Sequence, residues 1–426
     1  MGHYVQINQY ISANDYDSAL RTIAEKEGDY ASRDASLFHL EAGILAHYAE
    51  KYHQSNQYLS KAEEIMDALY TRSISRQAAS YLLNDLTIPY RGEDFENVMV
   101  NLFRALNYTG LGLGEDALVE ARKVDNKLNI INSRYDEEQQ NVYREDAFVR
   151  FLMGVLYEAG GEINDAFISY RKAEEIYRTD YESIYSVPAP IFLVENLLST
   201  AYALGFFQEA AEIQKRYPEA NPPKPEKKER LAEVFAIHYN GLGPEKVEQN
   251  WHIPMLDGYI VKIAYPVFKP QVYRISHAEI FLTHRESGET YRFVTQLMED
   301  IGAIAKMNLA NRMQRIKGKA IARATSKYLM TNALAGAARK ESGELAGVLV
   351  QLTANLANIA TEQADLRHGR LLPDEIRVGR SMVAPGGYDG WIDFIDSSGS
   401  VVFKKQVAAF RVRGGEKKIL TYRTLN

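Results

Sequence analysis

The stretch from Glu145 to Tyr177 constrains the fold of this chain more than any other. It reads EDAFVRFLMGVLYEAGGEINDAFISYRKAEEIY, which is two amphipathic segments of helical period joined by a short turn. Gly154 and Ala166 are small enough to let the two helices approach closely. Gly161 stands where the chain has to leave the first helix with a positive φ. The pattern predicts a helical hairpin that buries one face by stacking on similar hairpins.

Similar hairpins recur through the first half of the chain. The small residues equivalent to Ala166 are Ala19, Ser55, Ala117 and Ala210, with separations of 36, 62, 49 and 44 residues along the chain. The spacing of small and aromatic positions resembles that of tetratricopeptide repeats, which recur every ~34 residues when uninterrupted. Five repeats with insertions between them are therefore predicted. Stacked hairpins of this kind form an α-solenoid with a concave groove.

The first helix of each repeat is expected to line that groove. The predicted lining positions are Leu40, Ile44, Leu102, Leu106, Phe151 and Val155. All are apolar, whereas relatives that clamp a peptide carboxylate carry Asn and Lys there. Two interpretations remain open. The groove binds an apolar helix or strand of a protein partner, or its lining packs on an insertion or on the second half of the chain.

The composition changes after residue 217. Residues 218–230 are rich in proline and lysine, which favours a solvated linker over a continuing helix. The charge changes as well. Residues 1–230 contain 37 acidic and 24 basic residues, a net charge of −13, and residues 231–426 contain 19 and 26, a net charge of +7. The two halves are expected to have distinct roles or to dock on each other electrostatically.

The second half reads mainly as strands, because apolar and polar residues alternate in most of its segments. The predicted strands cover residues 231–239, 258–267, 272–284, 376–383, 388–395, 401–412 and 418–423. An Ala- and Gly-rich helical hairpin interrupts them. The sequence therefore predicts an α+β protein. Its parts are a tetratricopeptide-like solenoid at 1–217, a linker at 218–230, a sandwich-like β-rich domain at 231–292 and 367–426, and an inserted hairpin at 293–366.

The first helix of the predicted hairpin is basic. Residues 301–340 contain nine basic residues and no acidic one. The basic positions that share one helix face are Arg312, Arg315, Lys319 and Arg323. Such a face can be simply solvated, dock on an acidic protein surface, or make a peripheral contact with anionic lipid. Nucleic acid is not expected as a partner, because no aromatic residues alternate with the basic ones.

The second helix of the hairpin has an uncharged run over residues 345–361. The run is shorter than the ~20 apolar residues that a membrane-spanning helix needs, and it contains Asn and Gln. Its apolar stripe consists of Leu345, Val348, Leu352, Leu356 and Ile359. We expect the stripe to pair the second helix with the first, or to join copies of the chain into a homo-oligomer.

The sequence lacks recognisable catalytic and metal-binding motifs. The chain has no cysteine, which excludes disulfides, zinc thiolates and a cysteine nucleophile, and its nine histidines show no metal-ligand spacing. The segment Gly110-Leu-Gly112-Leu-Gly114 follows a predicted helix and lacks the Lys-Ser/Thr of a phosphate-binding loop, so it is interpreted as a turn within a repeat. We expect a protein that is not an enzyme and that binds neither cofactor nor metal.

Several short sequence motifs resemble those of a known family. In the first half they are Ala42-Gly43-Ile-Leu-Ala-His-Tyr48, Arg104-Ala-Leu-Asn-Tyr108, Ala117-Leu-Val-Glu-Ala-Arg122 and Tyr157-Glu-Ala-Gly160. In the second half they are Asn240-Gly-Leu-Gly-Pro-Glu-Lys246, Ile263-Ala-Tyr-Pro266, Ala364-Asp-Leu-Arg367, Leu372-Pro373 and Arg380. With these words in this order, the chain resembles a family of bacterial envelope proteins, mostly lipoproteins, with tetratricopeptide-like repeats and a C-terminal β-rich region.

The resemblance implies a role at the cell wall or outer membrane. We therefore expect a non-enzymatic scaffold of the bacterial envelope that recruits protein partners. The alternatives are an enzyme or ligand-binding module with a site where the halves meet, and an envelope component that self-assembles through the hairpin. Met1-Gly2-His3-Tyr4 does not read as a leader. A periplasmic or outer-membrane location would then require a trimmed leader with a lipidated cysteine, and the location would otherwise be cytoplasmic.

Overall fold

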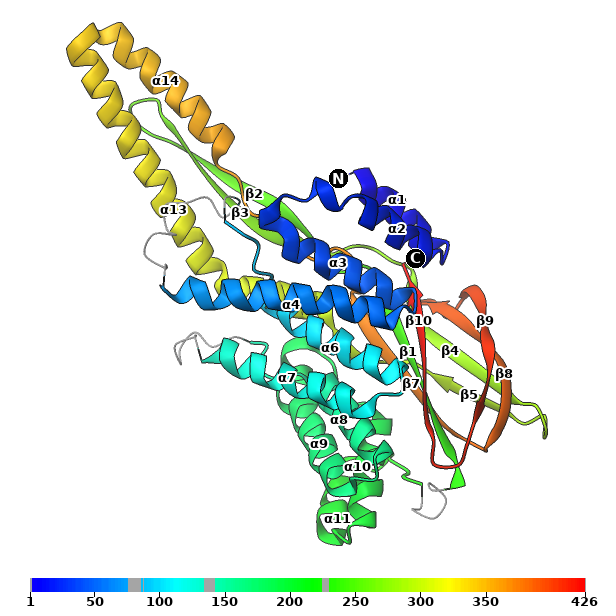
Figure 1. The fold of residues 1–426 in the computed structure, drawn as a ribbon. Helices are drawn as coiled ribbons and strands as arrows, with labels where there is room; N and C mark the ends of the chain where they lie inside the picture. The colour runs from blue at the N-terminus through cyan, green and yellow to red at the C-terminus, as the bar shows by residue number, and fades with distance from the viewer. Residues whose placement is uncertain (1, 76–85, 87, 134–141, 224–229, 426) are drawn as a thin grey trace.

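The fold of the chain is α+β, as the sequence predicts (Figure 1). A computed structural model of the protein describes residues 2–75, 86, 88–133, 142–223 and 230–425. Within these residues the first half forms five antiparallel helix pairs. The pairs are α1 (Gly2–Ser12) with α2 (Tyr16–Glu25), α3 (Ala35–Tyr48) with α4 (Tyr52–Ser75), α6 (Asp94–Gly110) with α7 (Gly114–Asn132), α8 (Ala147–Ala159) with α9 (Ile163–Ile176), and α10 (Ile191–Ala203) with α11 (Phe207–Arg216).

Small residues hold the paired helices together. A Cβ atom on Gly154 would collide with the ring of Tyr170 on the partner helix, and a Cβ on Gly43 would lie 2.6 Å from the side chain of Leu59. Gly161 turns the chain between α8 and α9 with a φ of +80°, which an L residue rarely adopts. Consecutive pairs stack, because α4 contacts α6, α7 contacts α8 and α9 contacts α10. The stacked hairpins predicted from residues 145–177 are therefore confirmed.

The second half forms two four-stranded sheets and a two-stranded ribbon. The strands are β1 (Ala232–Asn240), β2 (Glu245–Pro254), β3 (Ile260–Lys269), β4 (Ile275–His284), β5 (Thr290–Val294), β6 (Gln296–Asp300), β7 (Glu375–Val383), β8 (Gly386–Asp396), β9 (Val401–Val412) and β10 (Lys417–Thr424). One sheet has the order β10-β1-β7-β6, with β10 parallel to β1, and the other has the order β5-β4-β8-β9. Strands β2 and β3 pair only with each other among the described residues.

Strand β1 lies at the centre of the molecule, and all nine of its residues are buried. Val234 and Ala236 belong to a core between the two sheets, together with Ile280 of β4. Alternate residues of β1, such as Phe235 and Tyr239, belong to the core of the solenoid. The β10-β1-β7-β6 sheet is therefore the middle layer between the outer sheet and the helices (Figure 1).

The inserted hairpin consists of α13 (Ile301–Ser342) and α14 (Glu344–Thr361). Together with the β2–β3 ribbon it projects from the body as a long arm (Figure 1). The hairpin begins later than predicted, because residues 293–300 lie mostly in β5 and β6 rather than in a helix. Strand β2 was not predicted, because its residues are mostly exposed and do not alternate. The arm comprises residues 245–269 and 310–362.

Candidate functional site: a filled groove and a projecting arm

The groove of the solenoid is filled by the second half of the same chain. The six predicted lining residues are all buried, with exposed fractions of 0 to 4%, and belong to one hydrophobic core with Phe235 and Tyr239. They are Leu40, Ile44, Leu102, Leu106, Phe151 and Val155. The expectation of an open groove for a separate partner is therefore corrected. Covering this apolar surface with the chain's own sheet removes it from water, which stabilises the fold.

Aromatic side chains of β1 enter the groove. The ring of Tyr239 stacks on Phe103 of α6 with centroids 5.7 Å apart, and its hydroxyl lies 2.9 Å from Nε2 of His47 on α3. The ring of Phe235 contacts Phe151 of α8 edge to face at 5.9 Å. Burial lowers the pKa of His47 to about 4, so its imidazole is neutral at pH 7. His47 is thus part of the packed interface.

The chain that leaves the arm also runs through the groove. Residues 363–374 connect α14 to β7 without regular secondary structure and meet acidic side chains of the solenoid. The backbone N–H of Gly369 donates to Glu96 at 2.6 Å, and the backbone N–H of Arg370 donates to Glu41 at 3.2 Å. The sequence analysis did not predict that Glu96 and Glu41 bind this segment. The available signal was a carboxylate within an apolar stretch such as LEAGILAHY, since a buried carboxylate requires hydrogen-bond donors.

Buried ion pairs join the middle sheet to the last two repeats. The guanidinium of Arg380 on β7 lies 2.6 Å from Glu233 of β1 and 2.8 Å from Glu195 of α10, and it donates to Asn196 at 2.9 Å. Lys417 of β10 lies 3.0 Å from Glu158 of α8 and also pairs with Glu233. Because these groups are buried, each charge depends on its partners for solvation.

The root of the arm is held by a second charge cluster. Glu93 precedes α6, is buried, and pairs with Lys246 of β2 and Arg312 of α13. Burial alone would raise the pKa of Glu93, but the two cations outweigh it and hold the pKa well below its usual range. Arg323 is also buried and lies 2.5 Å from Glu362 at the end of α14. Arg312 and Arg323 are thus used inside the molecule, so the predicted basic face is not a continuous outer surface.

Two buried carboxyl groups meet where α8 contacts β6. Burial raises the pKa of Glu299 well above its usual range, and the nearby Asp146 raises it further. Burial likewise raises the pKa of Asp146, to about 6. Tyr181 donates to Glu299 at 3.0 Å, and Tyr143 donates to Asp146 at 2.7 Å. The cluster therefore favours the protonated carboxyls.

We predict that the protein loses stability as the pH rises. A carboxyl whose pKa is higher in the folded than in the unfolded chain favours folding while it is protonated, so its contribution declines from about pH 4.5 upward. The decline is about 1.4 kcal/mol per pH unit between the two pKa values. E299Q should flatten this dependence in urea unfolding measured at intervals between about pH 5 and pH 8. E182Q, on an exposed residue of the neighbouring π-helical segment Tyr177–Tyr185, should leave it unchanged. If the free energy of unfolding of E299Q changes with pH as steeply as that of the native sequence, the raised pKa of Glu299 is not the cause.

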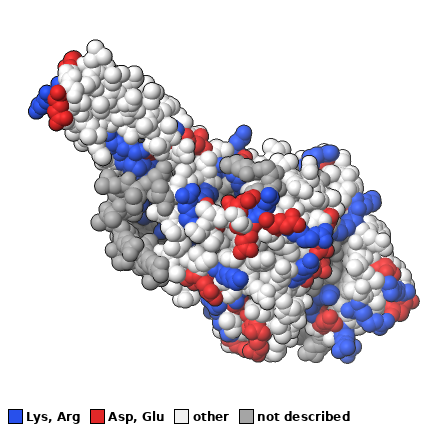
Figure 2. All heavy atoms as spheres, turned by 45° about the horizontal axis from the view of Figure 1, so that its top comes forward, with Lys and Arg blue, Asp and Glu red and all other residues white. Residues whose placement is uncertain are grey.

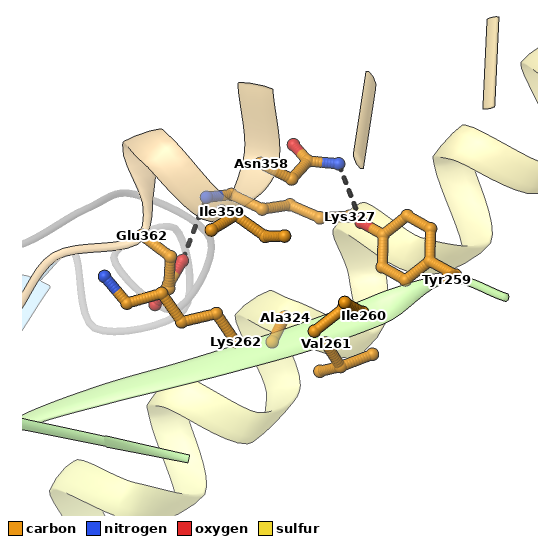
Figure 3. Close-up of a pocket in the computed structure, with 9 residues that line it drawn as sticks. All are labelled: Tyr259, Ile260, Val261, Lys262, Ala324, Lys327, Asn358, Ile359 and Glu362. Atoms are coloured by element: carbon orange, nitrogen blue, oxygen red, sulfur yellow. Dashed lines mark hydrogen bonds and ion pairs between the residues drawn. The ribbon is translucent and has the colours of Figure 1, made fainter. Parts of the chain in front are cut away.

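The inner seam of the arm contains hydrogen-bonded and charged side chains beside a small apolar cluster of Ile263, Ala320 and Ala324. Asn358 of α14 donates to the hydroxyl of Tyr259 at 2.8 Å and to Thr331 of α13 at 3.0 Å. Lys327 lies 2.9 Å from Glu362. Figure 3 shows Asn358 turned toward Tyr259, and Lys327 turned toward Glu362, around a hollow between α13, α14 and β3. The hollow has a volume of about 10 Å³, the space of one water molecule, so it has no room for a larger ligand.

The outer surface of the arm is apolar. The stripe residues Leu345, Val348, Leu352 and Leu356 of α14 are each more than half exposed, whereas Gly347 is buried. Four of the five stripe residues therefore face away from α13, and the expectation that the stripe pairs α14 with α13 is wrong for them. The fifth, Ile359, lines the hollow between the two helices. The helices pack instead through small and polar residues. Figure 2 shows the arm as a surface without charged residues between its charged tip and the Lys and Arg side chains at its base.

Within residues 2–75, 86, 88–133, 142–223 and 230–425, no cluster of three or more His, Asp or Glu side chains is arranged to hold a metal ion. In that same part of the chain, no helix has both the length and the apolar character to cross a membrane.

Comparison with known proteins finds partial structural likeness. No protein-family model and no curated protein matches the chain by sequence. The solved structures that are similar include the nearly identical TPR-like repeats of a kinesin light chain from Podosopora anserina, with 14% identity over 51% of this chain and 92% of that one and a TM-score of 0.34. BtubC from P. vanneervenii has 14% identity over 52% and 82% of the two chains and a TM-score of 0.33. A Rap protein complexed with Competence and Sporulation Factor has 14% identity over 51% and 52% and a TM-score of 0.30. With TM-scores this low, the evidence for the helical hairpins is the structure of the chain itself.

Proposed function

We propose that the protein is a non-enzymatic scaffold of the bacterial cell envelope that binds protein partners through the outer helices of its repeats. The observation that carries this proposal is the filled groove. Because the chain's own sheet and residues 363–374 occupy the inner face of the solenoid, the outer helices α7, α9 and α11 remain as the repeated surface that a partner can reach.

Equivalent positions on α7 and α9 have the same chemistry, whereas α11 has Glu212 in place of the apolar residue. Val119 and Ile168 each lie two residues after the small residue of their repeat, and both are exposed. Asp116 and Asp165, which precede the small residues, are exposed as well. A row of apolar side chains beside carboxylates suits a partner surface that carries apolar and basic residues. The envelope location is supported by the sequence resemblance, whose words span both halves of the chain.

The proposal predicts that crosslinks form from the outer helices. A photoreactive amino acid at position 119 or 168 in native cells should capture the same protein, identified by mass spectrometry. V119E should weaken that crosslink from position 168 about tenfold or more, because it places a charge in an apolar contact. Position 401, an exposed valine on β9 of the outer sheet, is the control. Capture of the same proteins from all three positions would contradict a specific surface, and recovery of the chain in the cytoplasmic fraction would contradict the envelope location.

A further inference from the structure

The distal part of the arm has its polar groups inside and its apolar groups outside. Eight large apolar residues of α13 and α14 have exposed fractions between 51 and 78%. They are Leu329, Met330, Leu334, Leu345, Val348, Leu349, Leu352 and Leu356. A monomeric protein in water rarely exposes a contiguous apolar patch of more than a few hundred Å². An exposed apolar surface of this extent indicates that another molecule covers it.

The inner contacts of the arm do not need that apolar surface. Gly347 lies so close to the side chain of Arg339 that a Cβ atom would collide with it. In the amide orientation that satisfies both groups, Asn355 donates to the carbonyl of Ile260 at 3.0 Å and accepts from its N–H at 2.9 Å. Packing through small residues and hydrogen bonds, with leucines turned outward, is the arrangement of helices whose solvent is lipid.

The charge of the arm selects among possible occupants. The arm contains eleven basic and six acidic residues, a net charge of +5, and the rest of the chain contains 39 basic and 50 acidic residues, a net charge of −11. Two arms of the same sign repel each other, which disfavours pairing with a second copy. An anionic lipid surface attracts the arm and repels the body, and thereby orients the molecule.

The order of residues along the arm fits a membrane interface. Near the root, the ammonium of Lys317 lies 4.8 Å from the ring of Trp251, whose side chain is 45% exposed, and 4.5 Å from that of Tyr265. Aromatic and basic side chains are favoured at the level of lipid headgroups. Beyond them come the uncharged runs 328–338 and 345–361. The charged tip keeps the arm along the surface, because burying those charges in the acyl region is costly.

We propose that the arm docks on an anionic phospholipid membrane. Its outer Leu, Val and Met side chains enter the boundary between headgroups and acyl chains, and Lys317 beside Trp251 contacts lipid phosphates. The acidic body then faces away from the membrane, with α7, α9 and α11 open to a partner. This inference goes beyond the proposed scaffold role and does not depend on the identity of a protein partner.

The test is flotation of the purified chain with lipid vesicles. The protein should float with vesicles of equimolar phosphatidylglycerol and phosphatidylcholine, and much less with pure phosphatidylcholine or at high salt. L349E/L356E should lower binding to the mixed vesicles by about 100-fold, since two apolar side chains are replaced by charges that the anionic surface repels. F207E is the matched control, because Phe207 is 67% exposed but lies on the body. Circular dichroism verifies that each variant is folded.

Each outcome decides the proposal. Flotation that depends on anionic lipid, is lost in L349E/L356E and is retained in F207E supports it. Failure of the native sequence to float, or equal binding by L349E/L356E, overturns it. A dimer in sedimentation that L349E/L356E dissociates, without vesicle binding, assigns the surface to a second copy and also overturns it. Crosslinks from positions 119 and 168 are a separate readout, so either proposal can fail without the other.

Discussion

Replacing Arg380 by alanine is expected to lower the free energy of unfolding by about 3–5 kcal/mol. Arg380 is buried and pairs with Glu233 and Glu195, so its loss leaves a largely uncompensated negative charge between the sheet and the solenoid. Lys417 also reaches Glu233 but cannot replace the contact to Glu195. Urea unfolding followed by circular dichroism measures the effect.

The matched control is R285A. Arg285 pairs with Asp389 at 2.6 Å, yet both side chains are about half exposed, so its loss should cost less than about 1 kcal/mol. Adding E195Q to R380A should recover part of the lost stability, because Glu195 loses its guanidinium partner in R380A whereas Glu233 keeps its pair with Lys417. Equal losses in R285A and R380A would show that burial of the Arg380 cluster has no energetic consequence.

The charge difference between the two halves was visible in the sequence, and the structure shows how it is used. Acids of the helical half meet bases of the second half at several buried or partly buried places. Glu93 pairs with Lys246, Asp34 lies 2.8 Å from Arg367, and Glu158 lies 3.0 Å from Lys417. Mutual docking was one of the expectations from the net charges of −13 and +7. The individual partners were not predictable, because they are separated by 150 residues or more along the chain.

The repeats could be predicted because their determinants are local. Gly154, Gly161 and Ala166 lie within one hairpin, and their spacing alone encodes the close contact and the turn. The contents of the groove depend on segments outside the hairpin that lie far along the chain, namely β1 and residues 363–374. Apolar lining residues are required for an external partner and for an internal sheet alike. The sequence therefore left both interpretations open, and tertiary structure decided between them.

The arm shows a second limit of sequence patterns. The spacing of Leu345, Val348, Leu352 and Leu356 correctly places them on one side of α14, but periodicity does not say which side faces the protein. In soluble domains the apolar side faces the core, and that assumption gave the wrong orientation here. Asn355 and Asn358 mark the inner side of α14 through their hydrogen bonds to Ile260 and Tyr259. These two amides within an apolar run are the sequence signal of the polar side of α14.

The filled groove predicts that the two halves unfold together, and Y239A tests this directly. Tyr239 inserts from β1 between Phe103 and His47 of the solenoid, so its removal leaves a cavity shared by both halves. A loss of about 3–5 kcal/mol is expected. Y239F keeps the ring and loses only the hydroxyl contact, so it should cost about 1 kcal/mol.

Two signals follow the halves separately. Circular dichroism reports the helices, most of which lie in the solenoid, and tryptophan fluorescence reports the second half, because Trp251 and Trp391 are the only tryptophans in the chain. In the native sequence the two urea transitions should coincide, and in Y239A both should move to lower urea together, since β1 belongs to both hydrophobic cores. If Y239A shifts the fluorescence transition while the helical transition stays in place, the solenoid is stable without the sheet in its groove. The inner face would then be able to open to a partner after all.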